Sequence, residues 1–199
     1  MKNLDQRNQI IEYSLKLNST NLSPLRSGNI SIRTKEDEKD GYLITPSGKK
    51  YETLKPEDIV FMSLNEDAEN EGSSNKPSSE WRFHRDIYLN KKEAQAIVHA
   101  HSPHATAVSS HGKTIPPFHY MIALAGGEDI KCAEYATFGT EELSKNVINA
   151  LQERSACLMS NHGQVAFGKS LEHAFELAQE LENICHQYTI ALKLGNPKI

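Results

Sequence analysis

The sequence predicts an α/β fold in which a central mixed, mostly antiparallel β-sheet is covered by helices. Short apolar segments of strand character alternate with amphipathic segments, and the first strands follow one another as a hairpin. The chain has 199 residues, of which 38% are hydrophobic and 24% charged. A chain of this size buries enough surface to fold without disulfides. No internal repeat or linker divides the sequence, so we expect residues 1–199 to form a single domain.

The first third of the chain is predicted to form a helix followed by strands. Apolar residues recur at helical spacing between Leu4 and Leu17. A charged segment ending in Gly41 separates two alternating apolar segments, which is typical of a hairpin. The expected elements are a helix over 4–18, strands over 29–33, 42–45 and 59–64, a turn at 46–48, and an acidic surface loop over 65–77.

The remaining elements are predicted from capping residues and apolar periodicity. Ser79, Ser102 and Ser170 each precede a helical pattern, where a serine hydroxyl can accept a hydrogen bond from the first turn. The expected helices are 80–90, one that starts at Pro103, 140–154, and a long one after Ser170. The expected strands are 96–101, 130–135, 156–160 and 164–167, the last two joined by Asn161-His162-Gly163.

The charge balance excludes several classes of partner. Lys and Arg number 22 against 26 Asp and Glu, a net charge of −4, so we expect neither a nucleic-acid coat nor a polybasic membrane binder. No apolar run approaches the roughly 18 residues of a membrane span, and Met1–Asn8 lacks the apolar core of a signal peptide. The three cysteines are widely spaced, which favours reduced thiols and a cytoplasmic protein.

Histidines are concentrated in one part of the chain. Six of the nine lie between residues 84 and 119. His99 and His101 stand two apart on a predicted strand, so both imidazoles point to one face, as a metal site requires. His162 in a tight connection and Glu80 in the first turn of a helix are further candidate ligands. Taken singly, each of these residues also fits an ordinary role at a turn, a core edge or a helix end.

Small residues with free backbone N–H groups indicate a possible anion site. They occur as Gly28-Asn29, Ser47-Gly48 and Ser78-Ser79, and the last pair lies at a predicted helix N-terminus. Each pair is also ordinary turn or cap chemistry, and none matches a P-loop or a dinucleotide fingerprint. Tyr120 stands in an apolar segment, where its ring could pack or its hydroxyl could donate a proton.

Together these segments resemble the class II aldolase/adducin family. The stretches that carry the resemblance follow the family's order and span most of the chain. They are GNISIR (28–33), ITPSG (44–48), PSSEWRFH (77–84), IVHAHSPHATAVS (97–109), IPPFHYMIALAGG (115–127), YATFGT (135–140) and NHGQVAFG (161–168). The implied fold is that of a class II aldolase.

The resemblance implies a role for each candidate residue. One Zn²⁺ per subunit, or another divalent metal, would be held by His99, His101, His162 and Glu80, and Glu80 would also act as a base. Tyr120 would donate a proton, and Phe138 would close the site of a neighbouring subunit on its aldehyde side in a homotetramer with active sites at subunit interfaces. The substrate phosphate would be bound by Gly28, Asn29, Ser47, Gly48, Ser78 and Ser79.

The implied activity is reversible cleavage of a ketose 1-phosphate, such as L-fuculose 1-phosphate, to dihydroxyacetone phosphate and a small aldehyde through a zinc-stabilised enediolate. Three alternatives stay open. A sugar-phosphate 4-epimerase would characteristically carry Asp where this chain has Glu80. A methylthioribulose-1-phosphate dehydratase shares the metal site and phosphate pocket. A non-catalytic adducin-like scaffold predicts lost metal ligands, and all four are present here.

Two segments depart from the family pattern. Ser23–Ser27 replaces a small, glycine-containing stretch and introduces Arg26 beside the expected phosphate pocket. Family aldolases also carry a tyrosine in a C-terminal tail, whereas the last tyrosine of this sequence is Tyr188, in the expected final helix. Both departures bear on the sugar accepted more than on the reaction type.

Overall fold

Seven strands of the described residues form one mixed sheet in this computed structural model, which describes residues 1–65 and 75–197. The order is β3-β2-β1-β4-β7-β6-β5, and all neighbours are antiparallel except the parallel pair β5 and β6. This confirms the predicted fold class. The strands are β1 (Asn29–Glu36), β2 (Lys39–Ile44), β3 (Val60–Ser63), β4 (Ala96–Ala100), β5 (Cys132–Ala133), β6 (Ala156–Met159) and β7 (Gly163–Gly168).

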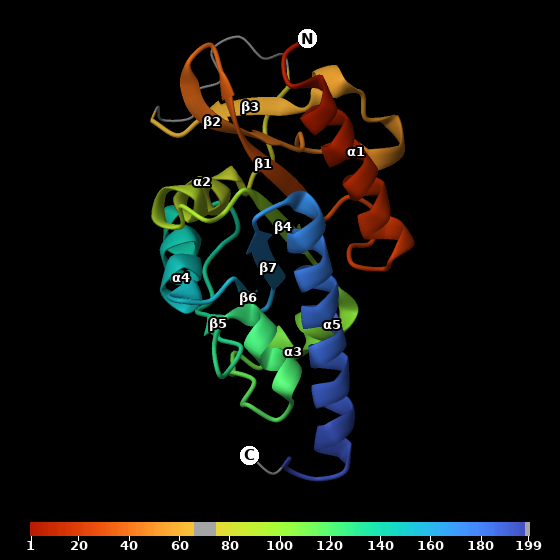
Figure 1. Cartoon of the computed structure of the whole chain (residues 1–199). Coiled ribbons are helices and arrows are strands. Elements are labelled where there is room, and N and C mark those ends of the chain that lie inside the picture. The colour runs from red at the N-terminus through yellow and green to blue at the C-terminus, as the bar shows by residue number, and fades with distance from the viewer. Residues whose placement is uncertain (66–74, 198–199) are drawn as a thin grey trace.

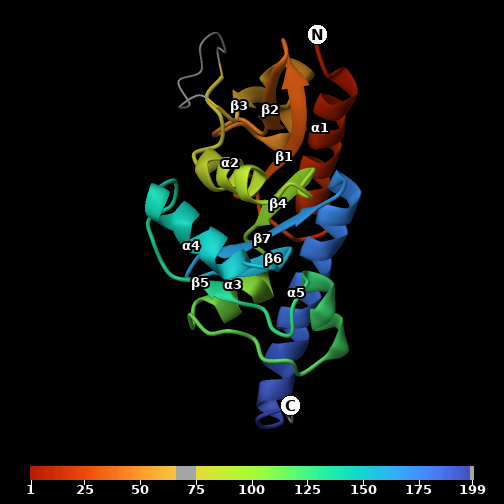
Figure 2. The ribbon, with the colours of Figure 1, turned by 60° about the vertical axis from the view of Figure 1, so that its left-hand side comes forward.

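Helices cover both faces of the sheet (Figure 1). Helices α1, α3 and α5 pack on one face around Ile10, Val98 and Leu181, and α2 and α4 pack on the other around Phe83, Ile97 and Val147. Figure 2 shows α1 and α5 on one side of the sheet and α2 and α4 on the other. The helices are α1 (Leu4–Ser19), α2 (Trp81–Asn90), α3 (Pro103–Ser109), α4 (Glu141–Leu151) and α5 (Leu171–Lys193), with 3-10 turns η1 (Tyr51–Thr53), η2 (Pro56–Asp58) and η3 (Tyr120–Ala125).

The first hairpin is tighter than the sequence predicted. Strands β1 and β2 extend through most of the charged segment that was expected to connect them, and Glu36 pairs with Lys39. Asp37 and Glu38 both have positive φ, 47° and 63°, as the central residues of a two-residue type I′ turn do. Without a glycine or asparagine at these positions, the sequence carries no clear signal for that turn.

The start of α2 differs by one residue from the prediction. The expected cap was Ser79, but Glu80 occupies the N-cap position, and its backbone N–H donates to the hydroxyl of Ser78. The cap predicted for the last helix is confirmed, with Ser170 accepting from His173 N–H, and Thr140, expected as the first residue of its helix, caps α4 by accepting from Leu143 N–H. The shift places the Glu80 carboxylate at the very start of the helix.

Helix α3 starts at Pro103 after Ser102, as predicted, but the Ser102 hydroxyl makes no capping bond. The carboxylate of Glu182 on α5 takes that place, accepting from the backbone N–H groups of His104 and Ala105, both at 2.8 Å. The predicted acidic loop 65–77 lies largely outside the described residues. Among the helices described, none is both long enough and apolar enough to cross a membrane.

Candidate metal centre and its surroundings

Four candidate ligands from distant parts of the sequence meet at one end of the central strands. His99 is the fourth residue of β4, and His101 follows just beyond its end. His162 lies in the turn between β6 and β7, and Glu80 caps α2. One ligand atom from each residue lies within 4.8 Å of all the others. The structure thus brings together the metal ligands that the sequence analysis expected.

The strand register explains why the histidines converge. β4 pairs with β7 so that Ala100 is opposite Gln164, which sets the turn carrying His162 beside the end of β4. Gly163 makes this approach possible, because a Cβ there would lie 2.4 Å from the carbonyl oxygen of Ala100. His99 shares the sheet face of Ile97, which is the face covered by α2.

The distances between the polar atoms are those of a compact cluster. Glu80 Oε2 lies 3.0 Å from His99 Nε2, and Glu80 Oε1 lies 3.1 Å from His162 Nε2. His99 Nε2 is 2.8 Å from His101 Nε2. Glu80 is only 5% exposed and His99 is fully buried, so these charges and lone pairs are largely withdrawn from water.

A backbone hydrogen bond sets the tautomer of His99. Its Nδ1 lies 2.8 Å from the carbonyl oxygen of Gln164, and a carbonyl can only accept, so Nδ1 carries the hydrogen. The lone pair of Nε2 therefore points into the cluster, as in metal-bound histidines whose other nitrogen is held by a carbonyl.

The pKa shifts within the cluster also favour the binding of a cation. Burial alone would raise the pKa of Glu80, but His99 and His162 lower it below its usual range. Burial, with His99 and His162 adding to it, lowers the pKa of His101 to about 3. At neutral pH Glu80 is therefore a carboxylate and His101 a neutral imidazole, and both are good ligands for a divalent metal.

Within the part of the chain that the structure describes, one buried oxygen of the cluster lacks a hydrogen-bond partner, and one pair of nitrogens faces each other at short range. Glu80 Oε1 is buried but accepts no hydrogen bond. The facing Nε2 atoms of His99 and His101 need a proton or a cation between them, because two lone pairs at 2.8 Å repel. A divalent cation among these side chains would satisfy both, so the donor set fits such a metal.

The cluster opens into a cavity of about 320 Å³ in the same chain. Glu80, His101 and His162 line it, and so do Ser79 from the expected phosphate pocket and Phe138. Phe138 is 64% exposed and borders the cavity of its own chain. Its expected contact with a neighbouring subunit stays a prediction.

The expected phosphate-binding residues fall into two groups. A bridge between Pro46 and Pro77 sets the Ser47-Gly48 turn beside Ser78-Ser79. The backbone N–H groups of Ser47 and Ser78 are already used, donating to Lys76 and Thr45. Gly48 has a φ of 76° and open space around its Cα, so it leaves the turn accessible to a ligand.

Gly28 and Asn29 lie behind the metal ligands. A Cβ on Gly28 would come within 2.7 Å of the carbonyl oxygen of His99, so only glycine allows the chain to pass there. The Asn29 side chain is buried, and its Nδ2 donates to Glu80 Oε2 at 2.9 Å. The structure therefore brings Asn29 into direct contact with Glu80, one of the candidate metal ligands, a contact that the sequence did not predict.

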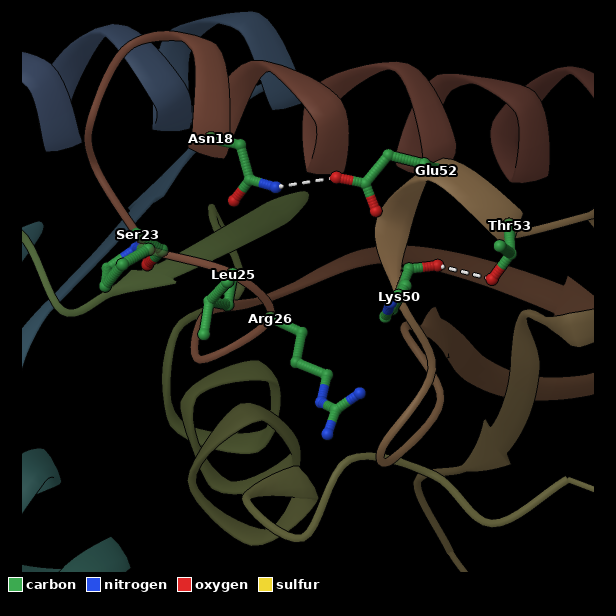
Figure 3. Close-up of a pocket in the computed structure, with 8 residues that line it drawn as sticks. Asn18, Ser23, Leu25, Arg26, Lys50, Glu52 and Thr53 are labelled. Carbon is green, nitrogen blue, oxygen red and sulfur yellow. Dashed lines mark hydrogen bonds between the residues drawn. The ribbon is translucent and has the colours of Figure 1, made fainter.

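A larger cavity of about 750 Å³ adjoins the segment that departs from the family pattern. Arg26 and Lys50 both line it, and Figure 3 shows them below the Asn18–Glu52 hydrogen bond. Leu25 is 82% exposed and has a φ of 58°, a conformation that costs energy for a leucine. The Ser23–Ser27 segment therefore carries the Arg26 guanidinium directly before residues 27–29, which belong to the site.

Tyr120 does not reach the metal cluster of its own chain. It lies in η3, is 81% exposed, and lines a separate cavity of about 440 Å³ with Phe118 and His119. The structure therefore does not bring Tyr120 and Glu80 together within one chain.

Sequence reasoning missed three buried polar residues behind the cluster, namely Ser31, His84 and Tyr88. They are linked to Asn29 by hydrogen bonds. Their spacing in the sequence could have indicated these residues. Asn29 and Ser31 are two apart on a strand, and Glu80, His84 and Tyr88 are four apart from the start of a helix, so each set lies on one face of its element.

This fold and its Glu-His-His-His cluster define a class II aldolase-type protein. The family model for the class II aldolase and adducin N-terminal domain matches residues 8–189, and the chain belongs to that family.

Individual relatives within the family agree on aldolase chemistry and differ in substrate. The chain is 46% identical over 189 residues to an L-fuculose phosphate aldolase of Escherichia coli strain K12, covering 95% of this chain and 85% of the relative. It is 43% identical over 194 residues to a 5-methylthioribulose-1-phosphate/5-deoxyribulose-1-phosphate aldolase of Rhodospirillum rubrum, covering 97% and 84%. A solved L-fuculose 1-phosphate aldolase superposes with a TM-score of 0.92 at 37% identity, covering all of this chain and 92% of that one.

Proposed function

We propose that the protein is a metal-dependent aldolase that reversibly cleaves a ketose 1-phosphate to dihydroxyacetone phosphate and a small aldehyde. The observation that carries the proposal is the convergence of Glu80, His99, His101 and His162, three of which line a cavity. Zn²⁺ is the metal we propose, one per chain, because three imidazoles and one carboxylate suit its coordination.

The substrate class follows from the relatives. Their names include L-fuculose 1-phosphate, 5-deoxyribulose 1-phosphate and 5-methylthioribulose 1-phosphate. Each is a ketose 1-phosphate, so cleavage between C3 and C4 gives dihydroxyacetone phosphate in every case and only the aldehyde differs. Our proposal therefore specifies the phosphate-bearing half of the substrate, which the three sugars share. It leaves the aldehyde half, in which they differ, to the assay.

The residues around the cavity suit a substrate with a phosphate-bearing half and an aldehyde half. When bound, a divalent metal would act as a Lewis acid for the negative charge that develops on the substrate beside the carbonyl. We propose that the phosphate is bound by Ser79, which lines the cavity, and by the open turn at Gly48. Glu80, ionised at neutral pH, would remove a proton from C3 of dihydroxyacetone phosphate in the condensation direction.

Tyr120 enters this scheme through a second subunit. Its exposure and its distance in the fold from the metal cavity favour a role across an interface between copies of the chain. We propose a homotetramer in which Tyr120 of one subunit gives a proton to the nascent alkoxide of the aldehyde bound in the next.

The test is a panel of the three ketose 1-phosphates with zinc-loaded protein. Dihydroxyacetone phosphate is followed through a coupled NADH-dependent reductase, before and after chelation. We expect release from at least one substrate and its suppression by the chelator, and the highest kcat/KM then identifies the preferred aldehyde. An epimerised sugar, a dehydrated diketone, or no product from metal-replete protein would overturn the proposal in favour of the epimerase, the dehydratase or the scaffold.

A further inference from the structure

A chain of buried hydrogen bonds runs from the metal ligands into the core between β1 and α2. Asn29 Oδ1 lies 2.5 Å from His84 Nε2, and His84 Nδ1 lies 2.7 Å from the hydroxyl oxygen of Ser31. The Ser31 hydroxyl is in turn 2.8 Å from that of Tyr88. With the bond from Asn29 to Glu80, the chain links five side chains, all of them at most 5% exposed.

Two periodicities make this chain possible. On β1, Asn29 and Ser31 point to the same face and stand about 6.6 Å apart along the strand. From the start of α2, Glu80, His84 and Tyr88 follow one another at intervals of about 6.0 Å along the helix axis. Because these intervals nearly match, Asn29 bridges Glu80 and His84, and Ser31 bridges His84 and Tyr88.

The chemistry of the groups gives each hydrogen bond a direction. The Asn29 side chain presents its NH₂ group to Glu80 and its carbonyl oxygen to His84, and an amide oxygen can only accept. His84 Nε2 must then carry the hydrogen, which leaves Nδ1 to accept from Ser31, and the Ser31 oxygen accepts from Tyr88. Every hydrogen in the chain is thus donated toward Glu80.

The burial of His84 supports this assignment. The side chain is fully buried and stacks on Phe83, with ring centroids 4.7 Å apart. Burial, with His99 adding to it, lowers the pKa of His84 to about 3. The ring is therefore neutral at pH 7 and has one hydrogen to place.

We propose that His84 is a positioning residue for the metal site: as the Nε2–H tautomer it holds the Asn29 amide with its NH₂ group toward Glu80. If the donor at His84 were lost, the amide could rotate and present its oxygen to the carboxylate. That arrangement would repel Glu80 Oε2 and leave a buried acceptor unpaired. The inference rests on the proposed function only in that Glu80 serves as a metal ligand, and it makes no claim about the substrate.

The most direct test is the tautomer itself, read by ¹⁵N NMR of histidine-labelled protein, metal-free and zinc-loaded. We expect His84 to give the pair of ring shifts of a neutral imidazole protonated at Nε2 in both forms. A neutral Nδ1–H ring or an imidazolium at pH 7 would overturn the proposal. The experiment uses the unaltered chain, so it does not depend on whether a variant folds.

A second test measures metal affinity with a matched control. His84→Leu replaces the imidazole with an apolar side chain of similar reach and so removes the Nε2–H donor. We expect its Zn²⁺ affinity to fall about 10- to 100-fold, with the loss partly restored in His84→Gln, whose amide can still donate. Tyr42→Phe removes another buried tyrosine hydroxyl on the same sheet face, one that donates to the backbone of Trp81, and should leave the affinity unchanged.

Equal affinity in folded His84→Leu, or an equal loss in Tyr42→Phe, would contradict a positioning role. These readouts are separate from catalysis. If the unaltered protein cleaves none of the ketose 1-phosphates, the proposed function fails, while the tautomer and the zinc affinity still decide the role of His84.

Discussion

At the scale of single residues, most contacts of the site meet at the Glu80 carboxylate. One of its oxygens faces His99 and Asn29, and the other faces His162 without a hydrogen bond. Burial works against its charge, and the neighbouring histidines outweigh that effect. A side chain so placed can bind a cation and, when displaced toward the substrate, accept a proton.

Glu80→Gln keeps the size of the side chain and removes its charge, so we expect the fold to persist and proton abstraction to be lost. Exchange of solvent hydrogen into dihydroxyacetone phosphate should fall by about 10²- to 10⁴-fold. NMR of dihydroxyacetone phosphate in D₂O measures the exchange without any aldehyde present. Exchange at the rate of the unaltered protein would exclude Glu80 as the base.

The sequence predicted single residues well where a motif fixes their geometry. His99 and His101 were expected on one face because strand side chains alternate, and the structure places them together. His84 was only one more histidine in a cluster, because its role depends on Asn29 and Ser31, more than 50 residues away. The contacts of Tyr120 could not be predicted from one chain, because its side chain is mostly exposed to solvent in that chain.

At the scale of elements, helix starts set the geometry of the site. Glu80 is the N-cap of helix α2, and α3 begins two residues after His101, which follows the strand that carries His99. The cap of α3 comes from α5, 78 residues further along the chain. Sequence rules for caps consider neighbours within a few positions, so they predicted Ser170 correctly but not Glu182.

Removing the Glu182 carboxylate should destabilise the fold, because two backbone N–H groups at the start of α3 lose their acceptor. We expect Glu182→Ala to lower the free energy of unfolding by about 1–2 kcal/mol. Urea denaturation measures this against Glu176→Ala, an exposed residue of the same helix. Equal stability of the two variants would show that the cap contributes nothing.

The Asp129 carboxylate, in the turn before β5, should make the stability of the fold depend on pH. Burial alone would raise the pKa of Asp129, but hydrogen bonds from Lys131 and Arg154 hold it below its usual range. A lowered pKa in the folded state stabilises the protein above the unfolded pKa of about 3.9, and this contribution is lost as the pH falls through the folded pKa.

Asp129→Asn should therefore be less stable than the unaltered protein at pH 7, and the difference should shrink below about pH 4. Unfolding curves from pH 7 to pH 2 measure it, with Glu128→Gln as the exposed neighbouring control. A difference that stays constant over this range would show that the Asp129 charge is not involved.

At the scale of the whole molecule, the fold brings four candidate ligands together from three distant segments, but it brings only one of the two predicted aromatic residues to the same cavity. Phe138 borders the metal cavity, whereas Tyr120 faces solvent elsewhere. The fold class and the sheet were predictable from the patterns within one sequence, and the resemblance to a known family added the set of candidate metal ligands that the structure brings together. Contacts between copies leave no such periodic signal, so the tetramer and its shared sites stay proposals.

Sites shared between subunits would allow two inactive variants to complement each other. We expect Tyr120→Phe and Glu80→Gln each to be nearly inactive, and mixed oligomers of the two to recover activity in about a quarter of their sites. Mixing Glu80→Gln with His99→Ala is the matched control, since both residues belong to one cluster, and should restore nothing. Absence of recovery in verified mixed oligomers would place Tyr120 outside the reaction.

The central claim is that Glu80, His99, His101 and His162 hold a divalent metal on which aldol cleavage depends. The most direct measurement is a titration of metal-free protein with Zn²⁺, with bound metal and release of dihydroxyacetone phosphate followed in parallel. The account predicts that activity rises with bound zinc and levels off at about one equivalent per chain, that His99→Ala stays inactive and metal-free, and that the exposed His111→Ala behaves like the unaltered protein. Full activity in metal-free protein, or full zinc binding by His99→Ala, would contradict it.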